Sequence, residues 1–178
     1  AVLKELKQAQ HKKILAIRDL GFLPEAEFHS LADGEAPYLV GQNKELYPLR
    51  QILKMADLAS SGKPSGVDQL INGLSSQNAA IRYWAAMGLL MRGEPAVAQA
   101  HESLLNALED NSKSVRCIAA EALGKYGTQQ DVDNAVDTLI SLSDQKQEGV
   151  YVAMLALNGL DKLGSEKVAR VQDQIAKL

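Results

Sequence analysis

An internal repeat constrains the fold of this chain more than any other feature of its sequence. Residues 81–89, IRYWAAMGL, align with residues 115–123, VRCIAAEAL, at a spacing of 34 positions. The same spacing relates Gly93 to Gly127. A repeat of this length corresponds to one pair of helices, which buries its apolar face only by stacking on neighbouring pairs. The sequence therefore predicts a short helical solenoid.

A third, weaker copy extends the repeat toward the C-terminus. At a spacing of 37 positions it places Val152, Ala156, Leu160 and Gly164 opposite Val115, Ala119, Leu123 and Gly127. The three extra residues fit the polar segment 143–149. Each copy consists of an apolar first helix, then a short polar turn, and then a second helix that ends at glycine. The paired alanines, Ala85-Ala86 and Ala119-Ala120, are small enough to let the helices approach closely.

The composition agrees with an all-α chain. Aromatic residues make up 4% of it and hydrophobic residues 46%, and good helix formers dominate. We predict an α-α superhelix of about three short helical-hairpin repeats, preceded by two irregularly connected helices. The repeats are expected near 66–94, 97–128 and 130–164, with a capping helix at 165–178. Residues 1–62 form an N-terminal segment, and residues 63–178 form the repeat domain.

The segment ahead of the repeats is less regular. Apolar residues at three- and four-residue steps predict a helix over residues 2–20, ended by Gly21. Residues 21–44 are expected to form an ordered connection with one helical turn near 25–31. A further helix is predicted over 46–60, with the buried face Leu49, Ile52, Leu53, Ala56 and Ala59. The chain begins with alanine, so we expect a processed chain or a piece of a longer one.

The repeat pattern V/I-R-x-x-A-A-x-x-L, followed by glycine, resembles HEAT-like repeats. The upstream segments IRDLGFLPEAEFH (17–29), PY (37–38), LYPL (46–49) and MADLAS (55–60) resemble the region after the catalytic domain of bacterial arylsulfatase-family proteins. This resemblance implies a non-catalytic C-terminal extension whose partner is the catalytic domain of the same polypeptide. It would place the chain in the periplasm or outside the cell. The C/S-x-P-x-R motif of formylglycine sulfatases does not occur in these 178 residues, and the one cysteine, Cys117, lies in a repeat helix.

Two groups of polar residues are candidates for chemical sites. His101 and Glu102 form a His-Glu pair of the kind that HEAT-like metal oxygenases use, but the equivalent positions Val67 and Asp68 add no second pair. We interpret the pair as a solvent-facing first helical turn. Glu25, Glu27, His29 and Asp33 lie within nine residues and are interpreted as a solvated loop, the alternative being part of a site completed by another domain.

Two further groups are candidates for binding surfaces. Arg82 and Arg116 are equivalent, and we expect each to reach the turn or first helix of an adjacent repeat, for instance Asp110 or a carbonyl; an anionic ligand is the alternative. Tyr83, Met87 and Met91 form a stripe that the helix over 46–60 is expected to cover. The alternative is an exposed patch that docks a partner. These five residues constitute the predicted interaction surface.

The function predicted from these features is a non-catalytic scaffold or interaction domain. A net charge of −3 argues against a nucleic-acid groove, and no segment reaches the length of a membrane span. We predict no cofactor, no metal and no catalytic residue. The alternative is a stand-alone HEAT-like enzyme or ligand-binding protein with polar residues converging on its concave face from three second helices.

Overall fold

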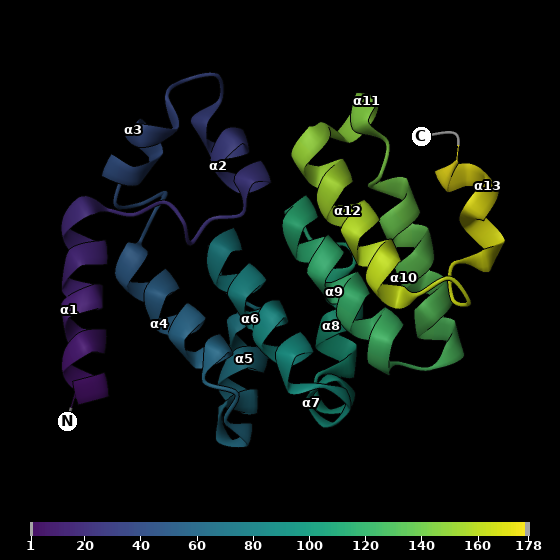
Figure 1. Cartoon of the computed structure of the whole chain (residues 1–178), viewed down its shortest axis with the longest axis horizontal. Helices are drawn as coiled ribbons and strands as arrows, with labels where there is room; N and C mark the ends of the chain where they lie inside the picture. The colour runs from purple at the N-terminus through teal and green to yellow at the C-terminus, as the bar shows by residue number, and fades with distance from the viewer. Residues whose placement is uncertain (1, 177–178) are drawn as a thin grey trace.

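The computed structural model describes residues 2–176, and within this range all regular structure is helical. The second helices of the three repeats are α6 (Ala79–Arg92), α9 (Lys113–Tyr126) and α12 (Val150–Leu163), and they stand side by side in one row (Figure 1). The first helices are α5 (Val67–Gly73), α8 (His101–Ala107) and α10 (Gln129–Ser141), which pack behind this row. The predicted all-α superhelix of helical hairpins is confirmed.

Polar caps begin the second helices of the first two repeats. The side chains of Asn78 and Ser112 accept hydrogen bonds from the backbone N–H groups of Ile81 and Val115, which satisfies one free donor at each helix start. Gly93 ends α6 with a φ of 75°, a conformation that favours glycine. Gly127 caps α9 as predicted. The caps explain why the repeat is visible in the sequence at a fixed spacing.

Small residues let the helices pack closely. The four paired alanines, Ala85, Ala86, Ala119 and Ala120, are fully buried. A Cβ atom added to Gly88 would lie 2.6 Å from a methyl carbon of Leu70 and 2.9 Å from the Cα of Ala59. Helix α4 (Leu49–Ser60), which precedes the first repeat, therefore packs directly on α6. All five residues predicted for its buried face are buried.

Short elements complete the repeats. The first helix of the second repeat is divided into α7 (Glu94–Gln99) and α8, and α5 is preceded by a 3-10 turn, Pro64–Gly66. Segment 143–149, where the extra residues were expected, contains α11 (Gln145–Glu148). At the C-terminus a 3-10 turn, Ala169–Val171, and α13 (Gln172–Ile175) take the place of the predicted capping helix over 165–178. Residues 177 and 178 lie outside the described range.

The N-terminal segment differs from its prediction in two respects. Helix α1 spans Val2–Ile17 and ends before Gly21, because Arg18 adopts a φ of 51° and donates hydrogen bonds to the carbonyls of Gly41 and Tyr47. The expected turn near 25–31 is α2 (Glu25–Ala32). An additional helix, α3 (Pro37–Gln42), follows it. The segment therefore holds three helices ahead of α4.

This segment has its own apolar core against one end of the row. Its fully buried Tyr47 and the nearby Leu23 and Val40 pack with Ile52 of α4 and Ile81 of α6. The indole of Trp84 donates a 2.8 Å hydrogen bond to the carbonyl of Phe22 and so fastens the connection after α1 to α6. The division at residue 62 stays a prediction.

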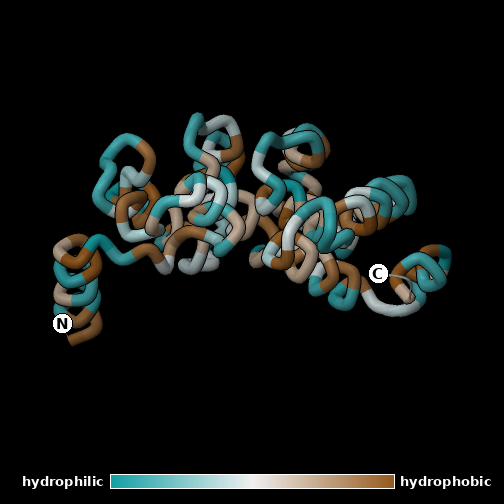
Figure 2. Tube along the Cα trace, turned by 90° about the horizontal axis from the view of Figure 1, so that it is seen from above, coloured by the Kyte–Doolittle hydropathy of each residue, from teal (hydrophilic) through white to brown (hydrophobic). Residues whose placement is uncertain are grey.

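The row of helices is curved, with both ends of the chain on one side of the arc (Figure 2). The two views together place α6, α9 and α12 on the inner side of this curve and the first helices on the outer side (Figures 1 and 2). The second helices therefore form the concave face, as in other helical solenoids. Within the described residues no helix is long and apolar enough to cross a membrane.

Candidate interaction surface

The concave face receives one stripe of side chains from each second helix. The stripes are equivalent through the repeat spacing: Tyr83, Met87 and Met91 on α6, Cys117, Glu121 and Lys125 on α9, and Met154, Asn158 and Lys162 on α12. Met91 is 56% exposed and Met154 is 49% exposed, whereas Cys117 and Glu121 are buried. Exposed methionines therefore lie on the two helices that flank a polar centre.

The cover of Tyr83 and Met87 by helix 46–60 stays a prediction. Helix α4 meets α6 at Gly88, five residues and about 140° round the helix from Tyr83, and therefore on another face. Tyr83 lies near Glu121 of α9, and burial, with this carboxylate, raises the pKa of its phenol. Both Tyr83 and Met87 are partly buried against the main core, and Met91 is left exposed.

A charged cluster occupies the centre of the concave face. The carboxylate of Glu121 is only 4% exposed, and its Oε2 lies 2.9 Å from the ammonium nitrogen of Lys162. Lys125, one turn further along α9, places its ammonium 3.8 Å from Oε1. Burying a carboxylate is costly unless it is paired, so the two lysines neutralise a charge that α9 cannot expose. The cluster links the second and third repeats.

The structure bears out the linking role predicted for Arg82. Its guanidinium forms two hydrogen bonds to the carboxylate of Asp110 in the next repeat, at 2.6 and 2.7 Å. It also donates to the carbonyl of Ser76, 2.8 Å away. Arg116 instead donates one 2.8 Å hydrogen bond to the carbonyl of Leu108, at the end of the first helix of its own repeat, so the contact with an adjacent repeat that was predicted for it is replaced by one within the repeat. Both arginines are thus engaged with the protein itself, and their membership of a docking surface stays a prediction.

The interpretation of residues 25–33 as a solvated loop is wrong. Glu27 is buried and accepts a hydrogen bond from the hydroxyl of Ser112, the N-cap of α9. The imidazole of His29 stacks on Tyr151 of α12, with ring centroids 4.7 Å apart and planes 8° from parallel. Helix α2 therefore contacts the N-terminal ends of α9 and α12, the second helices of the second and third repeats.

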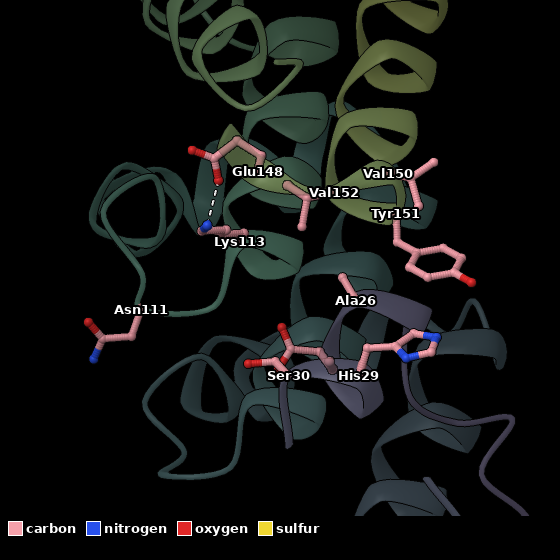
Figure 3. Close-up of a pocket in the computed structure, with 11 residues that line it drawn as sticks. Ala26, His29, Ser30, Asn111, Lys113, Glu148, Val150, Tyr151 and Val152 are labelled. Atoms are coloured by element: carbon pink, nitrogen blue, oxygen red, sulfur yellow. Dashed lines mark ion pairs between the residues drawn. The ribbon is translucent and has the colours of Figure 1, made fainter. Parts of the chain in front are cut away.

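A cavity of about 350 Å³ lies between α2 and the start of α12 (Figure 3). His29 and Ser30 approach it from α2, and Tyr151 faces them from α12 (Figure 3). On the far wall Lys113 and Glu148 form an ion pair of 2.5 Å. Lys113 and Glu148 pair with each other and Glu27 accepts from Ser112, so these charged side chains of the lining are engaged within the protein.

His101 has a different setting from the one predicted. Its Nε2 lies 3.0 Å from both carboxylate oxygens of Asp131, at the start of α10, so it contacts the third repeat while keeping partial exposure. Glu102 remains exposed, as expected for a first helical turn. Asp131 also forms a capping box with Thr128. Burial raises the pKa of Asp131, but hydrogen bonds from Thr128 and His101 outweigh burial and hold it below its ordinary value.

Groups able to support other chemistry are engaged or inaccessible. Burial raises the pKa of the Cys117 thiol to about 12, which keeps it protonated and unreactive near neutral pH. Among residues 2–176 no cluster of three or more histidine, cysteine or acidic side chains has the geometry of a metal site.

Sequence reasoning missed three residues that shape this surface. The repeat alignment could have identified Met154, because this residue aligns with Cys117 at the spacing of 37. Asp131 carried a signal in the motif T-x-x-D, which is close to a capping box. Trp84 carried none, because its hydrogen-bond acceptor lies 62 positions away in an irregular connection.

Comparison with known proteins bears on the repeats alone. A sequence model of the HEAT repeat matches residues 102–129, which include most of α8 and all of α9. Curated proteins give no significant match to the chain. The matched repeat agrees with the observed hairpin geometry and supports a scaffold or interaction role.

Proposed function

We propose that this chain is a non-catalytic helical-repeat scaffold that docks a protein segment on the concave face formed by α6, α9 and α12. The observation that carries the proposal is the pair of exposed methionines, Met91 and Met154, on the helices either side of α9. Concave solenoid faces are extended binding surfaces, and flexible methionine side chains adapt to varied apolar partners.

The alternative, a ligand-binding protein or enzyme, has one observation in its favour. Glu121 and Lys162 meet near Tyr83, so polar groups from three consecutive second helices do converge. A general acid or base must be within reach of a substrate proton. Glu121 is buried beneath its two lysines, an arrangement that suits a link between repeats better than proton transfer.

We also propose that the scaffold is an extension of a sulfatase-like hydrolase. This proposal rests on the sequence resemblance of residues 17–60, and it implies a periplasmic or secreted parent. The residues encoded upstream of Ala1 test it. A C/S-x-P-x-R motif a few hundred residues ahead supports the parentage, and a native start codon at this position contradicts it.

Docking is tested by selection from a displayed library of 16-residue amphipathic helical peptides against the purified chain. We expect selected peptides to bind with dissociation constants near the micromolar range. Met91→Asp and Met154→Asp are expected to weaken binding about tenfold each, because each places a carboxylate in an apolar contact. The control is Tyr38→Asp on α3, which places the same carboxylate at another exposed apolar position, away from the concave face. Peptides that bind both methionine variants normally would contradict the proposal.

A further inference from the structure

Three lysines gather at the C-terminal end of α9. Lys125 and Lys162 share the single carboxylate of Glu121. Lys167 places its ammonium 2.7 Å from the carbonyl of Gly124 and 3.2 Å from that of Lys125. Three ammonium groups thus face one carboxylate and the carbonyl end of a helix. The side chains of Lys125 and Lys162 remain 35% and 49% exposed, so both retain hydrogen-bonding capacity toward solvent.

The sign of this cluster is opposite to that of the whole chain, whose net charge is −3. Between α1 and α4, by contrast, the carboxylate of Asp57 lies 2.9 Å from the ammonium nitrogen of Lys7 and 3.1 Å from Nε2 of His11. There one carboxylate faces one lysine and one histidine. Of these two clusters, the one at the ends of α9 and α12 carries the larger excess of positive charge.

Exposed apolar side chains lie on α9 and α12, the helices that carry Lys125 and Lys162. The ring of Tyr126, which is 37% exposed, lies about 4 Å from where a Cβ atom on Gly93 would be, so it packs at the end of α6. Met154 lies on α12 about two helical turns before Lys162, a separation that a docked helix can span. An occupant of this surface therefore meets methionine and tyrosine side chains with ammonium groups at their edge. That combination matches a helix with apolar residues on one face and carboxylates beside them.

We propose that the segment docked by this scaffold is an acidic amphipathic helix, whose carboxylates bind Lys125 and Lys162 while its apolar face covers Met91, Tyr126 and Met154. The inference rests on the proposed docking function and specifies the chemistry of the partner. Binding would give each lysine a second carboxylate in addition to Glu121. Each ammonium group has three N–H donors and can therefore donate to two carboxylates at once.

The peptide selection described above tests the charge preference. We expect acidic residues to outnumber basic ones severalfold among the selected sequences, and we expect affinity for the chosen acidic peptide to fall about fivefold when the salt concentration rises from 0.05 to 0.5 M. Selected sequences without an acidic bias would overturn the inference. The docking function would then still stand if Met91→Asp weakens binding, so the two failures are distinguishable.

A substitution that increases affinity separates recognition from structural damage. Glu121→Gln removes the internal carboxylate while keeping the shape of the side chain, and it frees Lys125 and Lys162 for an external one. We expect this variant to bind the acidic peptide about three times more tightly, although the fold loses an ion-pair network. Unchanged or weakened binding by Glu121→Gln would overturn the inference.

Two matched variants complete the experiment. Lys125→Gln is expected to weaken binding of the acidic peptide about threefold. Lys125→Arg keeps the charge and is expected to bind the peptide as the parent chain does. Lys12→Gln on α1 removes the same charge outside the concave face and should leave affinity unchanged. Equal losses for Lys12→Gln and Lys125→Gln would show that net charge alone governs binding and would overturn the inference.

Discussion

The repeat region and the N-terminal segment are held together in different ways. The repeats share one continuous core that runs from α4 to the C-terminal turn, and each second helix packs on the next. The N-terminal segment packs on one end of this row through a smaller core. Long-range polar contacts, such as that between Trp84 and the carbonyl of Phe22, fix its irregular connections. Stacking thus distributes stability along the repeats, while the segment depends on a few anchors.

Truncating one leucine in each of the two cores should give the largest losses of stability and show whether the two regions unfold separately. Leu123→Ala, in the fully buried centre of α9, is expected to lower the free energy of unfolding by about 3 kcal/mol and to expose amides throughout the repeats. Leu23→Ala, in the smaller core, is expected to cost about 2 kcal/mol and to expose mainly residues 18–48. Denaturant titration with hydrogen exchange measures both. Identical exchange patterns in the two variants would show that the regions unfold as one unit.

The link between the first two repeats gives the next largest effect. Arg82→Ala leaves the mostly buried Asp110 without its two guanidinium hydrogen bonds, and we expect a loss of about 2 kcal/mol. Arg116→Ala, the matched control, loses one hydrogen bond to a carbonyl and should cost about 1 kcal/mol. Thermal unfolding of both variants provides the comparison. A smaller loss for Arg82→Ala than for its control would refute the linking role.

The acid dependence of stability tests the link between the second and third repeats. Because the pKa of Asp131 is below its ordinary value of 3.8 in the folded chain, its ionised form stabilises the fold above that value. This contribution is lost as the pH falls through the lower, folded-state pKa. Asp131→Asn should cost about 1 kcal/mol at neutral pH and make stability less sensitive to acid below about pH 4. Parallel acid titrations of the variant and the parent chain would contradict this assignment.

The bridge formed by α2 gives the smallest effect. His29→Ala removes one aromatic stack on Tyr151 and should cost about 0.5 kcal/mol, with faster exchange confined to α2 and the start of α12. Ser30→Ala, beside it on the same helix, is the control. If exchange in α12 does not change, α2 does not brace the third repeat.

The sequence was informative where local rules act and uninformative where distant segments meet. The paired alanines, the buried face of α4 and the polar turns follow from spacing and capping, and each was predictable. The contacts Glu27–Ser112 and His29–Tyr151 join residues with no sequence relation, so no periodic pattern could reveal them. On the concave face the alignment identified the stripe of Tyr83, Met87 and Met91. Which neighbouring helix lies against this stripe depends on the rotation of α6 about its own axis, and spacing alone does not fix that rotation.

The four methionines of the chain allow the most direct test of the docking face. Met87, Met91 and Met154 lie on the concave face, whereas Met55 packs against Gly73 between α4 and α5. With methyl-labelled methionine, titration of the selected acidic peptide should shift the NMR signals of the three concave methyl groups and leave that of Met55 in place. A shift confined to Met55, or equal shifts in all four signals, would contradict docking on the concave face.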